Sequence, residues 1–377
     1  MITKNNIEKS TYKDFIYIKE ILSEYTKRAY VVGGALRDTI LGIKVHDLDI
    51  EVYDIDIDKF SKIMQYIGAK GVGKSFFVYK YNNIDISLAR IEKKSGKGHK
   101  AFEVRITGNE KEASRRRDFT MNALMYHIYK KELLDFWGGK KDIKNKIIKI
   151  VDTESFKEDS LRVLRAVQFS ARFGFKCDKD SICVMQEIKL DDLSKDRIFW
   201  EFEKLFQAKY LQFGFYYLVK LGIMKKLFDI DLKCEDFFKI CKVFIKYQFG
   251  FEKEFYKYYF LYIISQILNI DIFTLLQKLN TPKIYEKFYK LQPKLSLAPN
   301  DKELLEIALK IPVKMYLLNY IPAVKNRAKE LGVYYKKFKT DINVKDIIKE
   351  GFKGADISKE IKKRELKYIN NFLSSKF

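Results

Sequence analysis

One stretch, residues 30–53, constrains the fold and chemistry of this chain more than any other. It begins with an apolar, β-branched run that meets Gly33 and Gly34 and then passes into Ala-Leu-Arg-Asp. This pattern predicts a strand, a tight turn and a helix. The glycines allow a ligand to approach the backbone closely, and the free N–H groups at the start of the helix favour phosphate. The stretch therefore predicts a phosphate-binding turn.

Two carboxylates follow one strand later. Asp47 and Asp49 alternate with Leu48 and Ile50, so both carboxylates point to one face of the predicted strand. Two neighbouring carboxylates repel each other unless a cation lies between them, and carboxylates together with bound phosphates suit Mg²⁺. Taken alone, the pair is also compatible with an exposed strand face. Opposite a phosphate-binding turn it describes a phosphoryl-transfer site, so we predict that Asp47 and Asp49 hold Mg²⁺ and are catalytic.

A second motif, residues 116–123, has the sequence Arg-Arg-Asp-Phe-Thr-Met-Asn-Ala. Arginine forks match phosphate oxygens, and Asp or Asn accepts a hydrogen bond from a sugar hydroxyl. A basic run alone is usually a solvated face, but this combination at the start of a predicted helix is more specific. It predicts that a nucleotide's triphosphate and ribose are held by Arg116, Arg117, Asp118 and Asn122.

A third motif lies at residues 158–166, which we expect to form one helix. Asp159 and Arg162 are three residues apart and would share a face of it, where the ordinary interpretation is an intrahelical ion pair. The functional interpretation follows from base edges. Cytosine and adenine both present an amino donor beside a ring-nitrogen acceptor, whereas uracil and guanine reverse the pair. A fixed carboxylate beside a fixed Arg donor would therefore accept C and A and reject U and G.

Together these motifs resemble those of the class II tRNA nucleotidyltransferases, the CCA-adding enzymes, and of the closely similar bacterial poly(A) polymerases. The resemblance covers roughly the first 205 residues, with the motifs in the expected order. The matching segments are Gly33-Gly34-x-x-Arg37-Asp38 with Asp47-x-Asp49, Arg116-Arg117-Asp118-x-x-x-Asn122-Ala123, Glu158-Asp159-x-x-Arg162 and Asp196-Arg197.

The resemblance implies an activity and further site residues. An RNA 3′-hydroxyl would attack the α-phosphate of CTP or ATP and release pyrophosphate. Gly33, Gly34 and Arg37 would join the triphosphate site, and Arg165 would join Asp159 and Arg162 in nucleobase selection. Glu158 and Asp85 are accessory candidates, and for Asp85 an edge-strand polar residue is an equally good interpretation. The segment Asp196-Arg197 is expected to pack neck helices.

Two positions depart from the family pattern, and one segment bears on specificity. Gln168 stands where the family commonly has Arg, and Ala89 replaces a proline. The glycine- and charge-rich segment Arg90–Phe102 predicts a mobile loop, and its length argues against an enzyme that adds only CC. Poly(A) addition, A-only or CC-only addition, and a non-catalytic tRNA-binding protein stay open as alternatives.

We expect an α+β chain: a head with a nucleotidyltransferase-type mixed sheet and helices, followed by an all-helical neck, body and tail. The predicted boundaries are residues 1–147 for the head, 148–206 for the neck with the nucleobase-selecting helix, 207–281 for the body, and 282–377 for the tRNA-binding tail. The apolar run Tyr258–Leu276 is interrupted by polar residues and predicts a buried helix rather than a membrane span.

Charge and cysteines indicate the partners. Lys and Arg outnumber Asp and Glu by 73 to 50, giving a net charge of +23, which favours a polyanion, although an AT-rich genome would also enrich lysine. The partners expected are the tRNA 3′ end, CTP and ATP, with no membrane and no other protein required. The four cysteines lack zinc-site spacing and the N-terminus lacks a signal-peptide core, so a cytoplasmic protein is expected. The sequence leaves the oligomeric state open.

Overall fold

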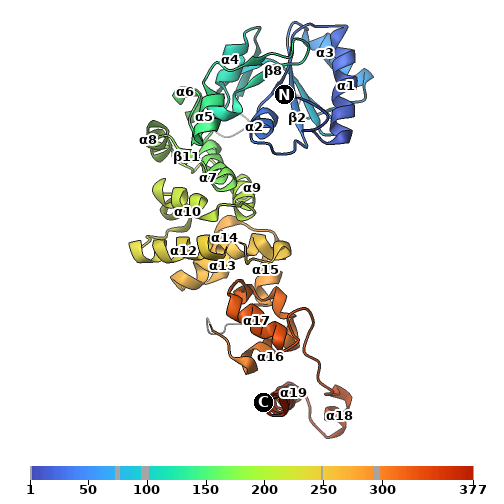
Figure 1. The fold of residues 1–377 in the computed structure, drawn as a ribbon, viewed down its shortest axis with the longest axis vertical. Helices are drawn as coiled ribbons and strands as arrows, with labels where there is room; N and C mark the ends of the chain where they lie inside the picture. Colours follow the sequence, from blue (N-terminus) through green and yellow to red (C-terminus); the bar gives the residue numbers. More distant parts are fainter. Residues whose placement is uncertain (1, 73–76, 95–101, 248, 293–297, 377) are drawn as a thin grey trace. The chain divides into compact units, whose positions relative to one another are not determined.

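The structure, a computed structural model, describes residues 2–72, 77–94, 102–247, 249–292 and 298–376. Figure 1 shows the course of the chain, coloured from the N-terminus to the C-terminus. By its internal contacts the chain divides into two compact units. Unit 1 comprises Met1–Glu201 and Phe213–Lys226, and unit 2 comprises Phe202–Gln212 and Leu227–Phe377. The finer division into head, neck, body and tail stays a prediction.

A mixed sheet forms the centre of unit 1, with strand order β3-β4-β5-β2-β1-β8-β9. Strand β2 is antiparallel to β1 and parallel to β5, and β1 is also antiparallel to β8. The mixed sheet predicted for the head is therefore confirmed. The strands are β1 (Ala29–Val32), β2 (Leu48–Val52), β3 (Lys70–Gly71), β4 (Val78–Tyr81), β5 (Ile84–Leu88), β8 (Met125–His127) and β9 (Leu133–Leu134).

The two faces of this sheet differ in chemistry. On one face Val31, Ile50 and Ile86 are in register and fully buried. Helices α1 (Lys9–Ser23) and α3 (Ile57–Tyr66) cover this face, where Tyr17 contacts Tyr81 and Phe60 contacts Tyr79. On the opposite face Val32, Asp49 and Asp85 are in register. The apolar face stabilises the sheet, which leaves the polar face for chemistry.

Short helices and two small β-pairs complete unit 1 and lead out of it. The small pairs are β6 (Arg90–Lys94) with β7 (Phe102–Ile106), and β10 (Ile147–Ile148) with β11 (Lys176–Cys177). The helices are α2 (Gly34–Ile40), α4 (Glu110–Arg115), η2 (Thr120–Asn122), α5 (Gly139–Asn145), α6 (Thr153–Lys157), α7 (Leu161–Phe173), α8 (Lys179–Glu187), α9 (Lys195–Phe206), α10 (Leu211–Lys220) and α11 (Ile223–Phe228).

The structure differs from the predicted secondary structure in two segments. The segment predicted as a mobile loop from Arg90 begins instead as strand β6, which pairs with β7; residues 95–101 of that segment lie outside the described residues. The region predicted as an all-helical neck contains strand β11, because Lys176 and Cys177 form a parallel two-residue pairing with β10.

Unit 2 is helical and has an aromatic core. Phe244 stacks on Phe260 with ring centroids 5.2 Å apart, and Phe251 stacks on Tyr259 at 4.3 Å. The elements are α12 (Cys234–Tyr247), η3 (Lys253–Phe255), α13 (Tyr256–Leu268), α14 (Ile272–Leu279), α15 (Lys283–Lys290), α16 (Asp301–Lys310), η4 (Val313–Met315), η5 (Leu317–Tyr320), α17 (Pro322–Glu330), α18 (Val344–Lys349) and α19 (Ala355–Lys376).

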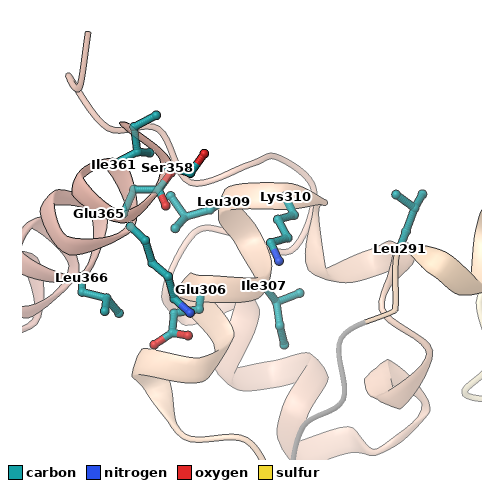
Figure 2. A pocket seen from close by; sticks show the side chains of 10 residues that line it. Leu291, Glu306, Ile307, Leu309, Lys310, Ser358, Ile361, Glu365 and Leu366 are labelled. Atoms are coloured by element: carbon teal, nitrogen blue, oxygen red, sulfur yellow. The ribbon is translucent and has the colours of Figure 1, made fainter. Parts of the chain in front are cut away.

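The run Tyr258–Leu276, predicted as one buried helix, forms most of α13 and part of α14. Within the described ranges, no helix combines the length and hydropathy that crossing a bilayer requires. Near the C-terminus, α16 and α19 border a pocket of about 320 Å³, with Ile307 and Leu309 on one side and Ile361 and Leu366 on the other (Figure 2).

Candidate active site

The predicted strand, turn and helix are present at β1, Gly33 and α2, and they bring a backbone turn against the carboxylate pair. Gly33 has φ +75°, and a Cβ atom there would lie 3.3 Å from Asp49 Oδ2 and 3.4 Å from Arg117 Nη1. Val32 pairs with Asp49 across β1 and β2, which fixes this proximity. Asp47, directly before β2, and Asp49 are both accessible to solvent, although the protein groups packed around Asp49 desolvate its carboxylate. Only glycine combines this conformation with this close approach.

A third carboxylate lies beside the pair. Asp85 on β5 is in register with Asp49, and its Oδ1 lies 3.6 Å from Lys80 Nζ. That oxygen is buried and accepts no hydrogen bond from the described residues. Desolvation raises the pKa of Asp49, Arg117 opposes this rise, and the negative charges of Asp85 and Asp47 add to it. Three carboxylates thus converge at one end of the polar face.

This donor set fits a divalent cation that also binds a nucleotide. Within the described ranges no group of three or more His, Cys, Asp or Glu side chains is arranged to enclose a metal ion. Asp47 and Asp49 could supply two oxygen ligands, and Mg²⁺ commonly takes only one or two carboxylates and completes its shell with water and substrate phosphates. Desolvation is the main cause of the raised pKa of Asp49, and the neighbouring carboxylates Asp85 and Asp47 add to it; a bound cation would oppose both effects.

Glu51 anchors the two arginines of the second motif, and the sequence interpretation missed it. It is 1% exposed, and its Oε2 lies 2.9 Å from Arg116 Nη2 and 3.4 Å from Arg117 Nη2. Its Oε1 accepts a 2.7 Å hydrogen bond from the Tyr53 hydroxyl. Burial alone would raise the pKa of Glu51, but Arg116 and Arg117 lower it below its usual range. Glu51 is therefore an ionised carboxylate that positions two cations beside Asp49.

A second buried network joins α2 to the segment after α4. Arg37 is 4% exposed; it donates to Asp38 through Nε at 2.8 Å and to Asn122 Oδ1 through Nη1 at 2.6 Å. Asn122 in turn donates to Asp118 Oδ1 at 2.9 Å. The segment expected to open a helix instead ends α4 and then forms the single 3₁₀ turn η2. Arg37 and Asn122 thus hold these two motifs together from within.

Asp118 carries this network on to α7. Its Oδ2 accepts a 2.7 Å hydrogen bond from Arg165 Nε. Burial would raise the pKa of Asp118, but Arg165 and the Asn122 hydrogen bond lower it below its usual range. The Arg165 guanidinium also lies 5.1 Å from the centroid of the Phe169 ring, and Arg37 lies at the same distance from it. The helix predicted to select the base is therefore fixed to the predicted ribose-binding residues.

The helix predicted over residues 158–166 is wrong in its start. Helix α6 ends at Lys157, Glu158 is its C-terminal cap, and α7 begins only at Leu161. Asp159 therefore lies in the connection between helices and not one turn before Arg162 on the same helix. The connection is stabilised by hydrogen bonds from Arg162 N to the Asp159 carbonyl and from Leu161 N to its carboxylate.

Asp159 and Arg162 each have a partner from another element. The Arg197 Nη2 on α9 donates to both Asp159 oxygens, at 3.1 and 3.2 Å. Arg162 donates to the Ser155 carbonyl at 2.7 Å and to the Arg116 carbonyl at 2.6 Å. Arg197, expected only to pack helices, therefore orients the predicted base-reading carboxylate. Arg162 ties the same region to the predicted triphosphate site.

Two protein-family models match parts of this chain. Residues 29–149 match the family model of the poly(A) polymerase head domain, and residues 175–230 match a model described as a probable RNA- and SrmB-binding site of polymerase A. The first match contains the carboxylate pair and both buried networks up to Asn122. The second contains Arg197.

Similar proteins extend the comparison. A multifunctional CCA protein of Aromatoleum aromaticum is 37% identical over 46% of this chain and 44% of its own length. A CCA-adding enzyme of Lactococcus lactis is 27% identical over 73% of this chain and 71% of its own. The chain spans about half the length of the first curated relatives it matches.

Solved structures share the fold. A structure of an apo CCA-adding enzyme superposes with a TM-score of 0.71 at 20% identity, covering 97% of this chain and 93% of that one. The CCA-adding enzyme of Bacillus stearothermophilus in complex with CTP gives a TM-score of 0.70 at 20% identity, covering 96% and 93%. Together with the two family matches, these structures show that the chain is similar in fold to CCA-adding enzymes and, over residues 29–149, to the poly(A) polymerase head domain.

Proposed function

We propose that this chain is a tRNA nucleotidyltransferase that transfers CMP and AMP units from CTP and ATP to the 3′ end of tRNA. The observation that carries the proposal is the carboxylate pair Asp47 and Asp49 beside the Gly33 turn and the Glu51-anchored arginines. A protein that only bound RNA would gain nothing from carboxylates facing its anionic ligand, whereas phosphoryl transfer requires them. Relatives named as CCA proteins support the same reaction.

The reaction is a displacement at phosphorus. The 3′-oxygen of the RNA forms a bond to the α-phosphorus of the nucleotide, the bond to the β-phosphate bridging oxygen breaks, and pyrophosphate leaves with that electron pair. Nucleotidyltransferases of this family generally use a divalent metal, and we propose Mg²⁺ held by Asp47 and Asp49. When bound, it would favour loss of the 3′-hydroxyl proton and offset the charge of the phosphates.

The chain's own residues orient the nucleotide. The bare backbone at Gly33 admits a phosphate close to Asp49, and Arg117 lies against the same turn. Arg116 and Arg117, held by Glu51, would bind phosphate oxygens. Arg37, Asp118 and Asn122 were predicted to contact the nucleotide. Their burial and mutual hydrogen bonds favour a positioning role, in which they fix α2, η2 and α7 around it.

Nucleobase selection is assigned to Asp159 and Arg162, with Arg165 in support. Asp159 presents an acceptor oriented by Arg197, and Arg162 presents a donor that is also tied to the Arg116 carbonyl. An acceptor for an amino group beside a donor for a ring nitrogen suits cytosine and adenine and leaves uracil and guanine mismatched. Since Arg162 also contacts the motif that would hold the triphosphate, base fit and phosphate position are linked.

Incorporation of nucleotides from CTP and ATP at defined tRNA 3′ ends tests the proposal. Transcripts that end before CCA, after C, and after CC are incubated with each of the four nucleoside triphosphates separately, with Asp49→Asn as the matched control. CCA addition predicts C on the first two ends and A on the third. A lengthening A tail on all ends indicates a poly(A) polymerase. Addition of C to the first two ends without A on the third indicates a CC-adding enzyme, and addition of A to the third end alone indicates an A-adding enzyme. No addition by the wild-type chain with Mg²⁺ contradicts the proposal.

The partners follow from the reaction. The net charge of +23 suits a polyanionic RNA. A cytoplasmic location is proposed because tRNA and nucleoside triphosphates are found there together.

A further inference from the structure

Unit 2 contains a pocket in which lysines and aromatic rings come together. Its volume is about 740 Å³, and it lies between the end of α9 and the segment that joins α12 to α13. The space is large enough for a nucleotide, and no residue of the proposed active site takes part in it. The lining residues are Gln207, Lys209, Phe249, Phe251, Lys253, Glu254, Tyr256 and Lys257.

The charge of the pocket is positive. Lys209, Lys253 and Lys257 line it, and within the described part of the chain none of the three is in an ion pair. Among the described lining residues the one acidic side chain is that of Glu254, which lies 3.0 Å from Lys314 Nζ, and this lysine offsets its charge. The pocket is therefore matched to an anion.

One aromatic side chain of the pocket, Phe249, is exposed, and the residues that follow it are closely packed. Phe251 is 8% exposed and stacks on Tyr259, and Gly250 lies so close to its surroundings that a Cβ atom there would meet the Tyr247 and Tyr320 carbonyl oxygens at 3.3 Å. Next to this fixed backbone, Phe249 is 83% exposed. An exposed phenyl ring beside lysines offers a base a stacking surface within reach of cations that contact its phosphate.

A second pocket in unit 2 makes a useful contrast. The pocket between α16 and α19 is lined by Glu306, Glu365, Lys310 and Lys362 along with apolar residues (Figure 2). Among the described residues that line it, the opposite charges are equal in number and no aromatic ring occurs, so they supply neither the net charge nor the stacking surface of the first pocket.

We propose that the Phe249 pocket binds one unpaired nucleotide of the RNA substrate, with the base stacked on Phe249 and the phosphate contacted by Lys253 and Lys257. The identity of the partner as RNA rests on the proposed function. A duplex would not fit in this way, because its bases are already stacked on one another and its rings are not available to Phe249.

Binding to a single-stranded and a double-stranded probe tests the proposal. The full chain is titrated against a fluorescein-labelled twelve-nucleotide RNA, alone and annealed to its complement. Phe249→Ala should weaken binding of the single strand by about tenfold, the scale expected for loss of one stacking platform, and change duplex binding less than twofold. Phe249→Trp should keep the affinity and show quenched emission on RNA binding. Phe238→Ala, an exposed phenylalanine on α12, is the matched control.

The lysines have a separate readout. Lys253→Gln should reduce the slope of log Kd against log salt by about 0.7 for the single strand, the value expected for one lost phosphate contact. Lys363→Gln on α19 is the control for a solvated lysine. Phe249→Ala binding the single strand within twofold of wild type overturns the proposal, as does equal weakening for single strand and duplex.

The two proposals fail separately. Nucleotide incorporation is measured on the same preparations with saturating tRNA. If the wild type incorporates nucleotides and Phe249→Ala binds the single strand with unchanged affinity, the proposed role of the pocket is wrong and the proposed enzyme activity stands. If RNA binding depends on Phe249 but no nucleotide is incorporated under any condition, the proposed enzyme activity is wrong and the RNA-binding role of the pocket stands.

Discussion

Replacing Glu51 by Gln tests whether a buried carboxylate positions the arginines of the active site. The change keeps the shape of the side chain and removes its charge. Oε2 of Glu51 is 2.9 Å from Arg116 and 3.4 Å from Arg117, so two cations would be left beside one another without their shared anion. An amide N–H placed against a guanidinium adds a donor facing donors. We therefore expect Glu51→Gln to displace one or both arginines.

The magnitude follows from the burial of the three groups. Removing one partner of a fully buried ion pair costs roughly 3–5 kcal/mol. The Glu51 side chain is 2% exposed, whereas those of Arg116 and Arg117 are 13% and 21% exposed and stay partly solvated. We therefore expect a loss of unfolding free energy of about 2–3 kcal/mol, below the fully buried range. We expect KM for CTP to rise about tenfold, equivalent to about 1.4 kcal/mol of lost binding.

The assay is steady-state incorporation of CTP on a tRNA ending before CCA, with urea unfolding of the same variants. Tyr53→Phe is the matched control, because it removes only the hydrogen bond to Oε1 and leaves the arginine pairs intact. It should cost about 1 kcal/mol and leave KM nearly unchanged. A Glu51→Gln variant that loses stability but keeps KM for CTP within twofold of wild type refutes the positioning role.

Three further predictions concern base selection and pH. Asp159→Ala should raise kcat/KM for UTP and GTP relative to CTP and ATP by roughly ten- to a hundredfold, since the lost acceptor is worth about 1–3 kcal/mol. An unchanged ratio of kcat/KM among the four nucleotides would show that Asp159 has only a structural role. Arg197→Lys keeps a positive charge but loses the guanidinium whose Nη2 meets both Asp159 oxygens, so it should shift the same ratio in the same direction by less; a loss of thermal stability with the ratio intact would assign Arg197 to packing. Because Arg165 holds the pKa of Asp118 below its ordinary 3.8, the ionised carboxylate stabilises the fold above pH 3.8 and this contribution is lost as pH falls through the folded-state pKa. The difference in unfolding free energy between wild type and Asp118→Asn should therefore shrink as pH falls below 3.8, and a constant difference down to pH 2.5 would contradict this.

Local patterns in the sequence predicted the centre of the site well. The run before Gly33, the glycine itself and the alternation around Asp49 each depend on a few neighbouring residues, and the strands and the turn form where expected. The fold class followed for the same reason. The roles assigned to Asp47, Asp49 and the nucleobase-selecting residues stay predictions, because contacts within the chain do not report on a ligand.

What the sequence did not predict depends on contacts between distant segments. Glu51 shares a strand face with Asp49, and the alternation that pointed to the aspartates also pointed to it. Its role depends on arginines 65 and 66 positions away. A buried glutamate in a strand must find a cation, and that rule could have prompted the search. Arg197 meets Asp159 across 38 residues, and the sequence gives no local sign of this pairing.

Two helix boundaries were wrong for local reasons. The segment Glu158-Asp159-Ser160 looks helical by charge pattern, but Asp and Ser are residues that commonly precede a helix. Helix α7 accordingly starts after Ser160. The segment after Arg115 was expected to open a helix, but Asp118 uses its carboxylate to bind the Phe119 N–H and the Asn122 amide, which favours the tight turn that is formed.

The most direct test of a catalytic role for Asp49 is the incorporation of labelled CMP into tRNA by the wild type and by Asp49→Asn. The enzyme is in excess over tRNA in each reaction, and tRNA binding is measured in parallel. We expect the wild type to extend a tRNA lacking CCA when Mg²⁺ is present. Asp49→Asn should bind the tRNA with an affinity within about threefold of wild type and extend it more than tenfold, and up to about a thousandfold, more slowly, because the carboxylate is needed to hold the metal for transfer and not to bind the body of the tRNA. Extension by Asp49→Asn within tenfold of the wild-type rate would show that the Asp49 carboxylate is not required for catalysis.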